Sequence, residues 1–299
     1  MRIVLATAEP RGAYHLTPFD PVVRTSEHEW LHLVPYPESR QGCSAVSAVS
    51  DVSVLEHADV VVITGGTLSA WTELVARYAN DLGLRTCFSE VSYLRPTPHH
   101  RPPRFDAITA VSKVGAQVIS AHLGVPFDKI IITGTPLTDS LPPHTPLPRR
   151  VLLLSTSEAT QIDPDGNLRS LGLHLLEQGF DVSVRCHPRE DSRTWEGFTL
   201  DSSASVLESA ALASVVVCYP RTASAPVAAL GVPVVSLVPE PEAASGLPAS
   251  LINLGTRVNT WQEAAAALND APPVPHEDLV DILGPVGGSA IRTVSHWVG

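Results

Sequence analysis

Three short apolar segments within residues 180–238 constrain the fold of this chain most. The first, residues 182–186, alternates apolar with polar side chains, whereas residues 215–218 (V-V-V-C) and 234–237 (V-V-S-L) are near-continuous apolar runs. Such runs are typical of strands buried on both faces of a parallel sheet. Polar residues follow the first two segments, where the strands should end. Because ligands of open parallel sheets bind outside the carboxyl ends of the strands, we expect a ligand site there.

Strand-like and helix-like patterns alternate through the rest of the chain. Residues 58–64 (A-D-V-V-V-I-T) predict a strand, and residues 68–82 predict a helix because apolar side chains recur at helical spacing. Gly83 is expected to end this helix in the left-handed conformation, and Gly124 is expected to stop a second helix at 114–123. This alternation predicts an α/β fold class with two domains. The expected boundaries are 1–141 for an N-terminal domain, 142–150 for a stiff proline-rich linker, 151–286 for a C-terminal domain and 287–299 for a closing helix.

Composition excludes several classes of function. The 299 residues fit two domains of about 150 residues. A net charge of -11 disfavours nonspecific nucleic-acid binding, which needs clustered cations. No run approaches the roughly 18 apolar residues of a membrane span, and the N-terminus lacks a signal-peptide pattern. The four cysteines form no C-x-x-C pair, so we expect reduced thiols and a cytoplasmic protein.

Three motifs occur in an order that resembles one superfamily. They are G-A-Y-H-L-T-P at residues 12–18, the segment from F-D-A-I-T at residue 105 to Leu141, and H-P-R-E-D at residues 187–191 together with residues 221–235. Together they resemble the two-Rossmann (GT-B) nucleotide-sugar glycosyltransferases. The nearest branches are the bacterial glycerophosphotransferases, the polysialyltransferases and the nonhydrolysing UDP-N-acetylglucosamine 2-epimerases. The resemblance implies two parallel sheets that face each other across a crevice, with the nucleotide donor held by the C-terminal domain.

The function implied by this resemblance is that of a glycosyltransferase in glycan or polysaccharide biosynthesis. It would move a sugar or related group from a UDP-, CDP- or CMP-linked donor to the hydroxyl of a sugar, lipid-linked or small-molecule acceptor. We expect no cofactor, no nucleic-acid partner and metal-independent chemistry. The adjacent His99 and His100 lie in a Pro/Arg-rich segment without nearby ligands, which favours an exposed loop over a metal site. The oligomeric state is not predicted.

Two alternatives stay open. An epimerase-like isomerase would need placed acid and base groups, but Gly66 stands where the epimerases have an aspartate, although Glu90 keeps one of their glutamates. The second alternative is a nonenzymatic descendant that binds a nucleotide or a partner protein.

Candidate donor-binding residues follow the strands of the second half. His187 ends a predicted strand, and with Arg189 it would bind a phosphate or nucleotide. Ser155 and Thr156 follow the first strand of this half and would line the same rim. The alternative for each of these residues is an ordinary polar turn.

A second group of candidates lies further along the chain. Thr222 and Ser224 precede a short predicted helix at 225–230, where Ser224 is a natural N-cap and the backbone amides would face a diphosphate. Glu240, together with Glu242, would accept hydrogen bonds from a ribose, or would belong to a solvated acidic loop.

The catalytic candidates lie in the first half. His15 is the expected general base, because an inverting transfer needs a group that deprotonates the acceptor hydroxyl and histidine is the commonest choice. Glu90, at the end of a neighbouring strand, would orient His15. Both have an alternative interpretation as ordinary polar loop residues.

Overall fold

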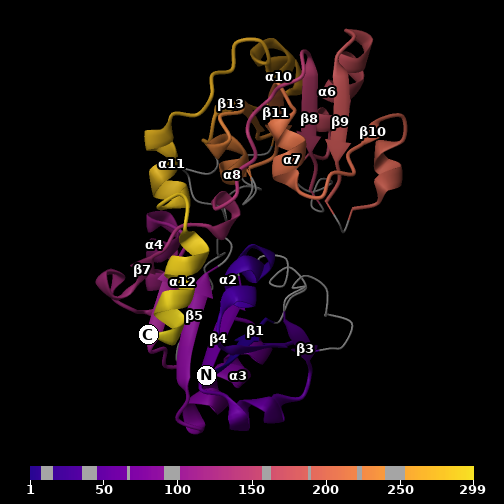
Figure 1. Ribbon diagram of the computed structural model, residues 1–299. Helices are drawn as coiled ribbons and strands as arrows, with labels where there is room; N and C mark the ends of the chain where they lie inside the picture. The colour runs from indigo at the N-terminus through magenta and orange to yellow at the C-terminus, as the bar shows by residue number, and fades with distance from the viewer. Residues whose placement is uncertain are drawn as a thin grey trace. The chain divides into compact units, whose positions relative to one another are not determined.

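The chain forms two compact units, each built on one parallel sheet. Unit 1 comprises Met1–Ser140 and Val280–Gly299, and unit 2 comprises Leu141–Leu279 (Figure 1). The computed structural model describes residues 1–7, 16–35, 46–65, 68–90, 102–156, 163–187, 190–220, 224–239 and 253–299. The fold class predicted from the sequence, two α/β domains with parallel sheets, is confirmed.

Unit 1 contains a seven-stranded sheet with the order β3-β2-β1-β4-β5-β6-β7, in which every neighbouring pair is parallel. Its strands are β1 (Arg2–Ala6), β2 (Glu29–Leu33), β3 (Ser47–Val49), β4 (Val60–Gly65), β5 (Arg85–Glu90), β6 (Ala107–Ala110) and β7 (Ile131–Ile132). Its helices are η1 (Thr17–Phe19), α2 (Asp20–Thr25), η3 (Val52–His57), α3 (Ala70–Asp81), α4 (Lys113–Leu123), η4 (Phe127–Lys129), η5 (Pro136–Thr138) and α12 (Ser289–Val298).

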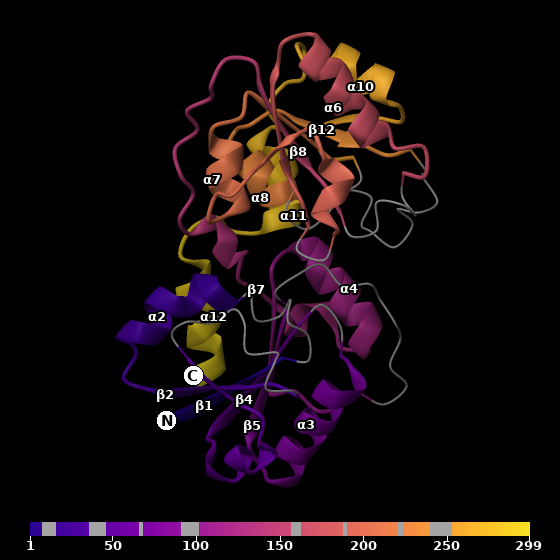
Figure 2. The ribbon, with the colours of Figure 1, turned by 90° about the vertical axis from the view of Figure 1, so that its right-hand side faces the viewer.

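Two apolar layers enclose this sheet. The strands β1 and β4 lie at its centre and are almost completely buried, as their near-continuous apolar sequence predicts. Helices α3 and α4 supply the core on one face, and α2 and α12 supply it on the other, as Figure 2 shows. The helix ends follow local rules: the Ser69 hydroxyl accepts a hydrogen bond from the Thr72 amide at the start of α3, and Gly124 ends α4 at φ 65°.

The last helix, α12, is part of unit 1. Trp297 is fully buried, and its ring centroid lies 5.1 Å from that of Phe19. Arg85 donates from Nε to the Trp297 carbonyl (3.0 Å) and from Nη2 to the His296 carbonyl (3.1 Å), which satisfies the last turn of the helix. At the other end, the Asp139 carboxylate accepts hydrogen bonds from the amides of Ser289 and Ala290, each at 2.8 Å. Both ends of α12 are therefore fastened to the first unit.

Unit 2 contains a six-stranded parallel sheet with the order β10-β9-β8-β11-β12-β13. Its strands are β8 (Arg150–Leu154), β9 (Asp181–Arg185), β10 (Thr199–Leu200), β11 (Val215–Cys218), β12 (Val234–Leu237) and β13 (Thr256–Val258). Its helices are α6 (Asn167–Glu177), η6 (Ser192–Trp195), α7 (Val206–Ala211), α8 (Ser224–Ala229) and α10 (Trp261–Ala267), and α11 (His276–Leu283) spans the boundary between the units. Helices α6 and α10 pack on one face of the sheet, and α8 packs against α7 and β12.

The unit boundaries differ from the expected ones at two places. Segment 142–150, expected to be a linker, lies within unit 2, where the Thr145 and Leu147 amides donate to the carbonyls of Ala211 and Leu212, each at 2.9 Å. The chain returns to unit 1 at Val280, before the expected boundary at residue 286, because Leu283 already accepts a hydrogen bond from the Thr135 amide (3.2 Å).

None of the helices in the described parts of the chain has the length and apolar character needed to cross a membrane.

Candidate functional site

The candidate site lies in unit 2, at the carboxyl ends of three adjacent strands. Strand β8 lies between β9 and β11, and all three run in the same direction. Ser155 follows β8 directly, His187 stands two residues after β9, and Tyr219 follows β11 directly. This is the edge at which open parallel sheets bind ligands. The topology therefore brings Ser155 and His187, both predicted from the sequence, to one edge.

Glu190 connects these strand ends. Its Oε1 accepts hydrogen bonds from the Ser155 hydroxyl (2.6 Å) and from the Trp195 indole (3.0 Å), and its Oε2 accepts one from the His187 amide (3.3 Å). The Glu190 amide in turn donates to the His187 carbonyl at 2.9 Å. Sequence reasoning assigned Glu190 no role. Its spacing of three residues from His187, which lets the two close a turn, was the available signal.

Another carboxylate, that of Asp163, is buried and lies just before α6. Its Oδ2 accepts hydrogen bonds from the Tyr219 hydroxyl (2.6 Å) and the Leu168 amide (2.9 Å), and its Oδ1 accepts one from the Asn167 side-chain amide (2.9 Å). Asn167 also accepts from the Trp261 amide at 3.0 Å, so the network reaches α10. The start of α6, the end of β11 and the start of α10 are thereby joined.

The expectation of metal-independent chemistry took the sequence to lack the D-x-D element of metal-dependent transferases, but Asp163 and Asp165 have that spacing and were overlooked. Asp165 is exposed, whereas Asp163 is buried and both of its oxygens accept hydrogen bonds from protein donors. Within the described ranges, no group of three or more His, Cys, Asp and Glu side chains is arranged to hold a metal ion.

The remaining donor-site candidates fall into two groups. Ser224 begins α8 and is fully buried, with its hydroxyl 3.4 Å from the Cys218 sulfur at the end of β11, and Thr156 is also buried. His187 is half-buried. Four of the predicted residues lie outside the described residues, namely His15, Arg189, Thr222 and Glu240, as do Gly66, His99, His100 and Glu242.

Glu90 lies in unit 1, at the last position of β5, and is only 3% exposed. Its Oε2 accepts a hydrogen bond from the Val111 amide at 3.0 Å, and its carboxylate lies against Gly115 in the first turn of α4. A negative charge at the start of a helix is stabilised by the helix dipole. This contact gives Glu90 a structural role, and its part in catalysis stays a prediction.

A buried histidine at the same end of this sheet escaped sequence reasoning. His32, in β2, is 1% exposed, and its Nε2 lies 2.7 Å from the Thr7 hydroxyl. Burial lowers the pKa of His32 to about 4, so the ring is neutral near pH 7. The Thr109 hydroxyl donates to Ser89 at 2.9 Å in neighbouring strands, so this end of the sheet carries buried, uncharged hydrogen-bonding groups.

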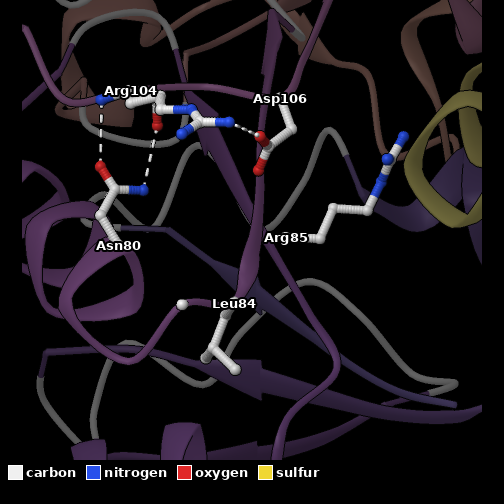
Figure 3. A pocket seen from close by; sticks show the side chains of 6 residues that line it. Asn80, Leu84, Arg85, Arg104 and Asp106 are labelled. Atoms are coloured by element: carbon white, nitrogen blue, oxygen red, sulfur yellow. Dashed lines mark hydrogen bonds and ion pairs between the residues drawn. The ribbon is translucent and has the colours of Figure 1, made fainter.

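One cavity of about 370 Å³ lies at the opposite end of the unit 1 sheet (Figure 3). It is lined by Asn80, Gly83, Leu84, Arg85, Arg104 and Asp106, which stand at or before the amino ends of β5 and β6. Arg104 pairs with Asp106 at 3.2 Å, while the Arg85 side chain points away from that carboxylate and holds the end of α12. The cavity contains none of the predicted site residues and lies away from the ligand-binding edge of the sheet.

Comparison with known proteins identifies the fold. No protein-family model and no curated protein matches the sequence. Solved structures do match along 99% of the chain. A Staphylococcus aureus MnaA–UDP structure is 14% identical over 95% of its own length, with a TM-score of 0.62. The UDP-GlcNAc 2-epimerase from Methanocaldococcus jannaschii is 14% identical over 99% of its length, with a TM-score of 0.61. The wall teichoic acid polymerase TagF is 11% identical over 87% of its length, with a TM-score of 0.64. The chain therefore has the GT-B fold, as its sequence motifs predicted.

Proposed function

We propose that this protein is a glycosyltransferase that takes a sugar, or a related group, from a nucleotide-activated donor bound by unit 2. The observation that carries the proposal is the meeting of Ser155, His187 and Tyr219 at the carboxyl edge of β8, β9 and β11. Similar structures include the MnaA–UDP structure and a TagF variant soaked with CDPG, which supports a UDP- or CDP-linked donor.

His187 is the proposed contact to the donor phosphates. The hydrogen bonds to Glu190 fix its backbone at both the amide and the carbonyl, and its half-buried side chain follows β9 at the ligand-binding edge of the sheet. A hydrogen bond to a charged phosphate contributes roughly 1.5–3 kcal/mol. Arg189, Thr222, Ser224 and Glu240 are proposed to complete the site, with the first three near the phosphates and Glu240 at the ribose.

The proposed chemistry is a metal-independent displacement. His15 accepts the proton of the acceptor hydroxyl, whose oxygen attacks the anomeric carbon. The bond from that carbon to the donor phosphate breaks, and the nucleotide leaves with the electron pair while His187 and Arg189 stabilise its negative charge. Glu90 is the next candidate for the base.

A second candidate function is an epimerase-like isomerization, because two of the similar structures are UDP-GlcNAc 2-epimerases. Glu90 occupies the position of one epimerase glutamate. Its carboxylate, however, accepts a hydrogen bond from the Val111 amide and packs against Gly115 of α4. Gly66 also stands in place of the aspartate that such chemistry needs. The transferase is therefore the better-supported proposal. A nonenzymatic nucleotide-binding protein is the remaining alternative.

Calorimetry with UDP, CDP, CMP, GDP and dTDP tests the proposal first. One of them should bind the wild-type protein, and His187→Ala should lower the affinity for that nucleotide roughly tenfold or more. His276→Ala is the matched control, because His276 belongs to unit 2 but is exposed on α11. Transfer of labelled sugar from the matching donor then separates a transferase from a binding protein. A wild-type protein that binds none of the five nucleotides would contradict the proposal.

A further inference from the structure

We propose that Glu190 is the positioning residue of the nucleotide site, and that Ser155 supports Glu190 instead of contacting the donor phosphates. The inference rests on the proposed function, because it concerns how that site is held in shape. It also changes the role that the sequence suggested for Ser155.

Ser155 has two hydrogen-bond donors, and the protein uses both. The hydroxyl proton is directed at Glu190 Oε1 over 2.6 Å, and the backbone amide donates to the Arg185 carbonyl at 3.1 Å. The side chain is also fully buried. A phosphate oxygen accepts hydrogen bonds and cannot donate them. Ser155 would therefore have to break its bond to Glu190 before it could bind a phosphate.

Glu190 fixes the backbone of His187 from both sides. Its amide donates to the His187 carbonyl (2.9 Å), and its Oε2 accepts from the His187 amide (3.3 Å). Its Oε1 is held by the indole of Trp195, which is 3% exposed and packs edge-on against Phe198 at 5.5 Å between ring centroids. The carboxylate thus connects the His187 turn to the hydrophobic core of unit 2.

The negative charge of Glu190 acts on Cys186, which lies at the same strand end. Burial, together with the Glu190 charge, raises the pKa of the Cys186 thiol to about 11. A carboxylate so close to a bound phosphate repels it. The two possible roles of the Ser155–Glu190 pair therefore predict opposite changes in phosphate affinity when the Glu190 charge is removed. If Ser155 contacted the phosphate, neutralising Glu190 would release the hydroxyl and strengthen binding. If Glu190 positions His187, neutralising it weakens binding.

The experiment is a double-mutant cycle with Glu190→Gln, Ser155→Ala and the double variant. Glutamine keeps one acceptor oxygen but cannot satisfy all three donors. Glu196→Gln is the matched control, because Glu196 is exposed and loses the same charge. Calorimetry with UDP and CDP should show an affinity loss of about tenfold for Glu190→Gln, about threefold or less for Ser155→Ala, and no further loss in the double variant. Unchanged or tighter binding by Glu190→Gln, or a tenfold loss in Ser155→Ala alone, overturns the proposal.

A second measurement separates this inference from the proposed function. Hydrogen exchange at the His187 amide should be about fivefold faster in Glu190→Gln than in Glu196→Gln, because a hydrogen bond of about 1 kcal/mol is lost. This readout needs no ligand. If the wild-type protein binds none of the five nucleotides, the proposed function fails, and equal exchange rates in the two variants would then overturn the positioning role as well. Faster exchange would support it.

Discussion

The carboxylate of Glu90 occupies the space that a side chain on Gly115 would need. A Cβ built on Gly115 would overlap both carboxylate oxygens, so the last residue of β5 and the first turn of α4 fit together only because residue 115 is glycine. The Val111 amide and this close approach hold the carboxylate at the start of the helix. Gly115 therefore serves packing between strand and helix, although it lies within a helix where glycine is otherwise unfavourable.

Substitution of Gly115 by alanine should destabilise unit 1 by about 1–3 kcal/mol, because overpacking outweighs the gain in helix propensity. The free energy of unfolding in urea measures the effect. The same substitution in a Glu90→Ala background is the control, since it should cost clearly less once the carboxylate is gone. Equal costs in both backgrounds would show that the contact does not determine the effect.

Acid should destabilise the native state through His32. Its folded pKa of about 4 lies below the ordinary value of 6.5, so between these values the unfolded chain binds a proton that the native state does not. The stability is complete above pH 6.5 and decreases as the pH falls towards 4, by about 3 kcal/mol in total. Urea unfolding between pH 4 and 7.5 measures this slope. His32→Gln should reduce it, whereas His57→Gln, at an exposed histidine, should leave it unchanged.

Asp201 is predicted to stabilise unit 2 through its hydrogen bonds. Burial works to raise its pKa, but hydrogen bonds from Ser209, Ser203 and Arg185 outweigh burial and hold the pKa below its usual range. Its contribution is thus present above pH 3.8 and is lost as the pH falls through the lowered pKa. Asp201→Asn should cost about 2 kcal/mol at pH 7. Asp191→Asn is the control, since Asp191 is half exposed, and a similar loss there would contradict the prediction.

Substitutions of His15 and His187 should change different kinetic parameters. If His15 is the general base, His15→Ala lowers kcat about 10²–10⁴-fold and leaves nucleotide affinity nearly unchanged. His187→Ala should act first on donor affinity. Calorimetry and initial rates on the same preparations decide between the two patterns. A His15→Ala variant that retains most of its transferase activity would reduce His15 to a loop residue and make Glu90 the next variant to measure.

The sequence predicted those parts of the fold that local patterns determine. The apolar runs at 60–64, 215–218 and 234–237 became buried strands, and Gly124 ends its helix as expected. The place of segment 142–150 within unit 2 was harder to predict. Its prolines indicate an extended chain, but they do not show that its amides bind the carbonyls of Ala211 and Leu212 at the end of α7.

The candidate site was only partly predictable for a similar reason. His187 and Ser155 could be placed because each follows a recognisable strand. Glu190 and Asp163 could not, since their roles depend on donors that arrive from other strands and helices only in the folded chain. His32 was missed because alternation within β2 does not distinguish a buried histidine from an exposed one.

The position of α12 has a consequence for how the protein is made. Unit 2 is one continuous segment, residues 141–279, whereas the core of unit 1 includes Trp297 from the last helix. During synthesis, the ribosome releases all of unit 2 before it releases the residues that complete unit 1. Unit 2 is therefore expected to fold first. Until α12 is made, residues 1–140 of unit 1 leave part of their apolar surface uncovered. Proteolysis of a released chain truncated after residue 287 should digest residues 1–140 and spare 141–279, and equal protection of both would refute this order.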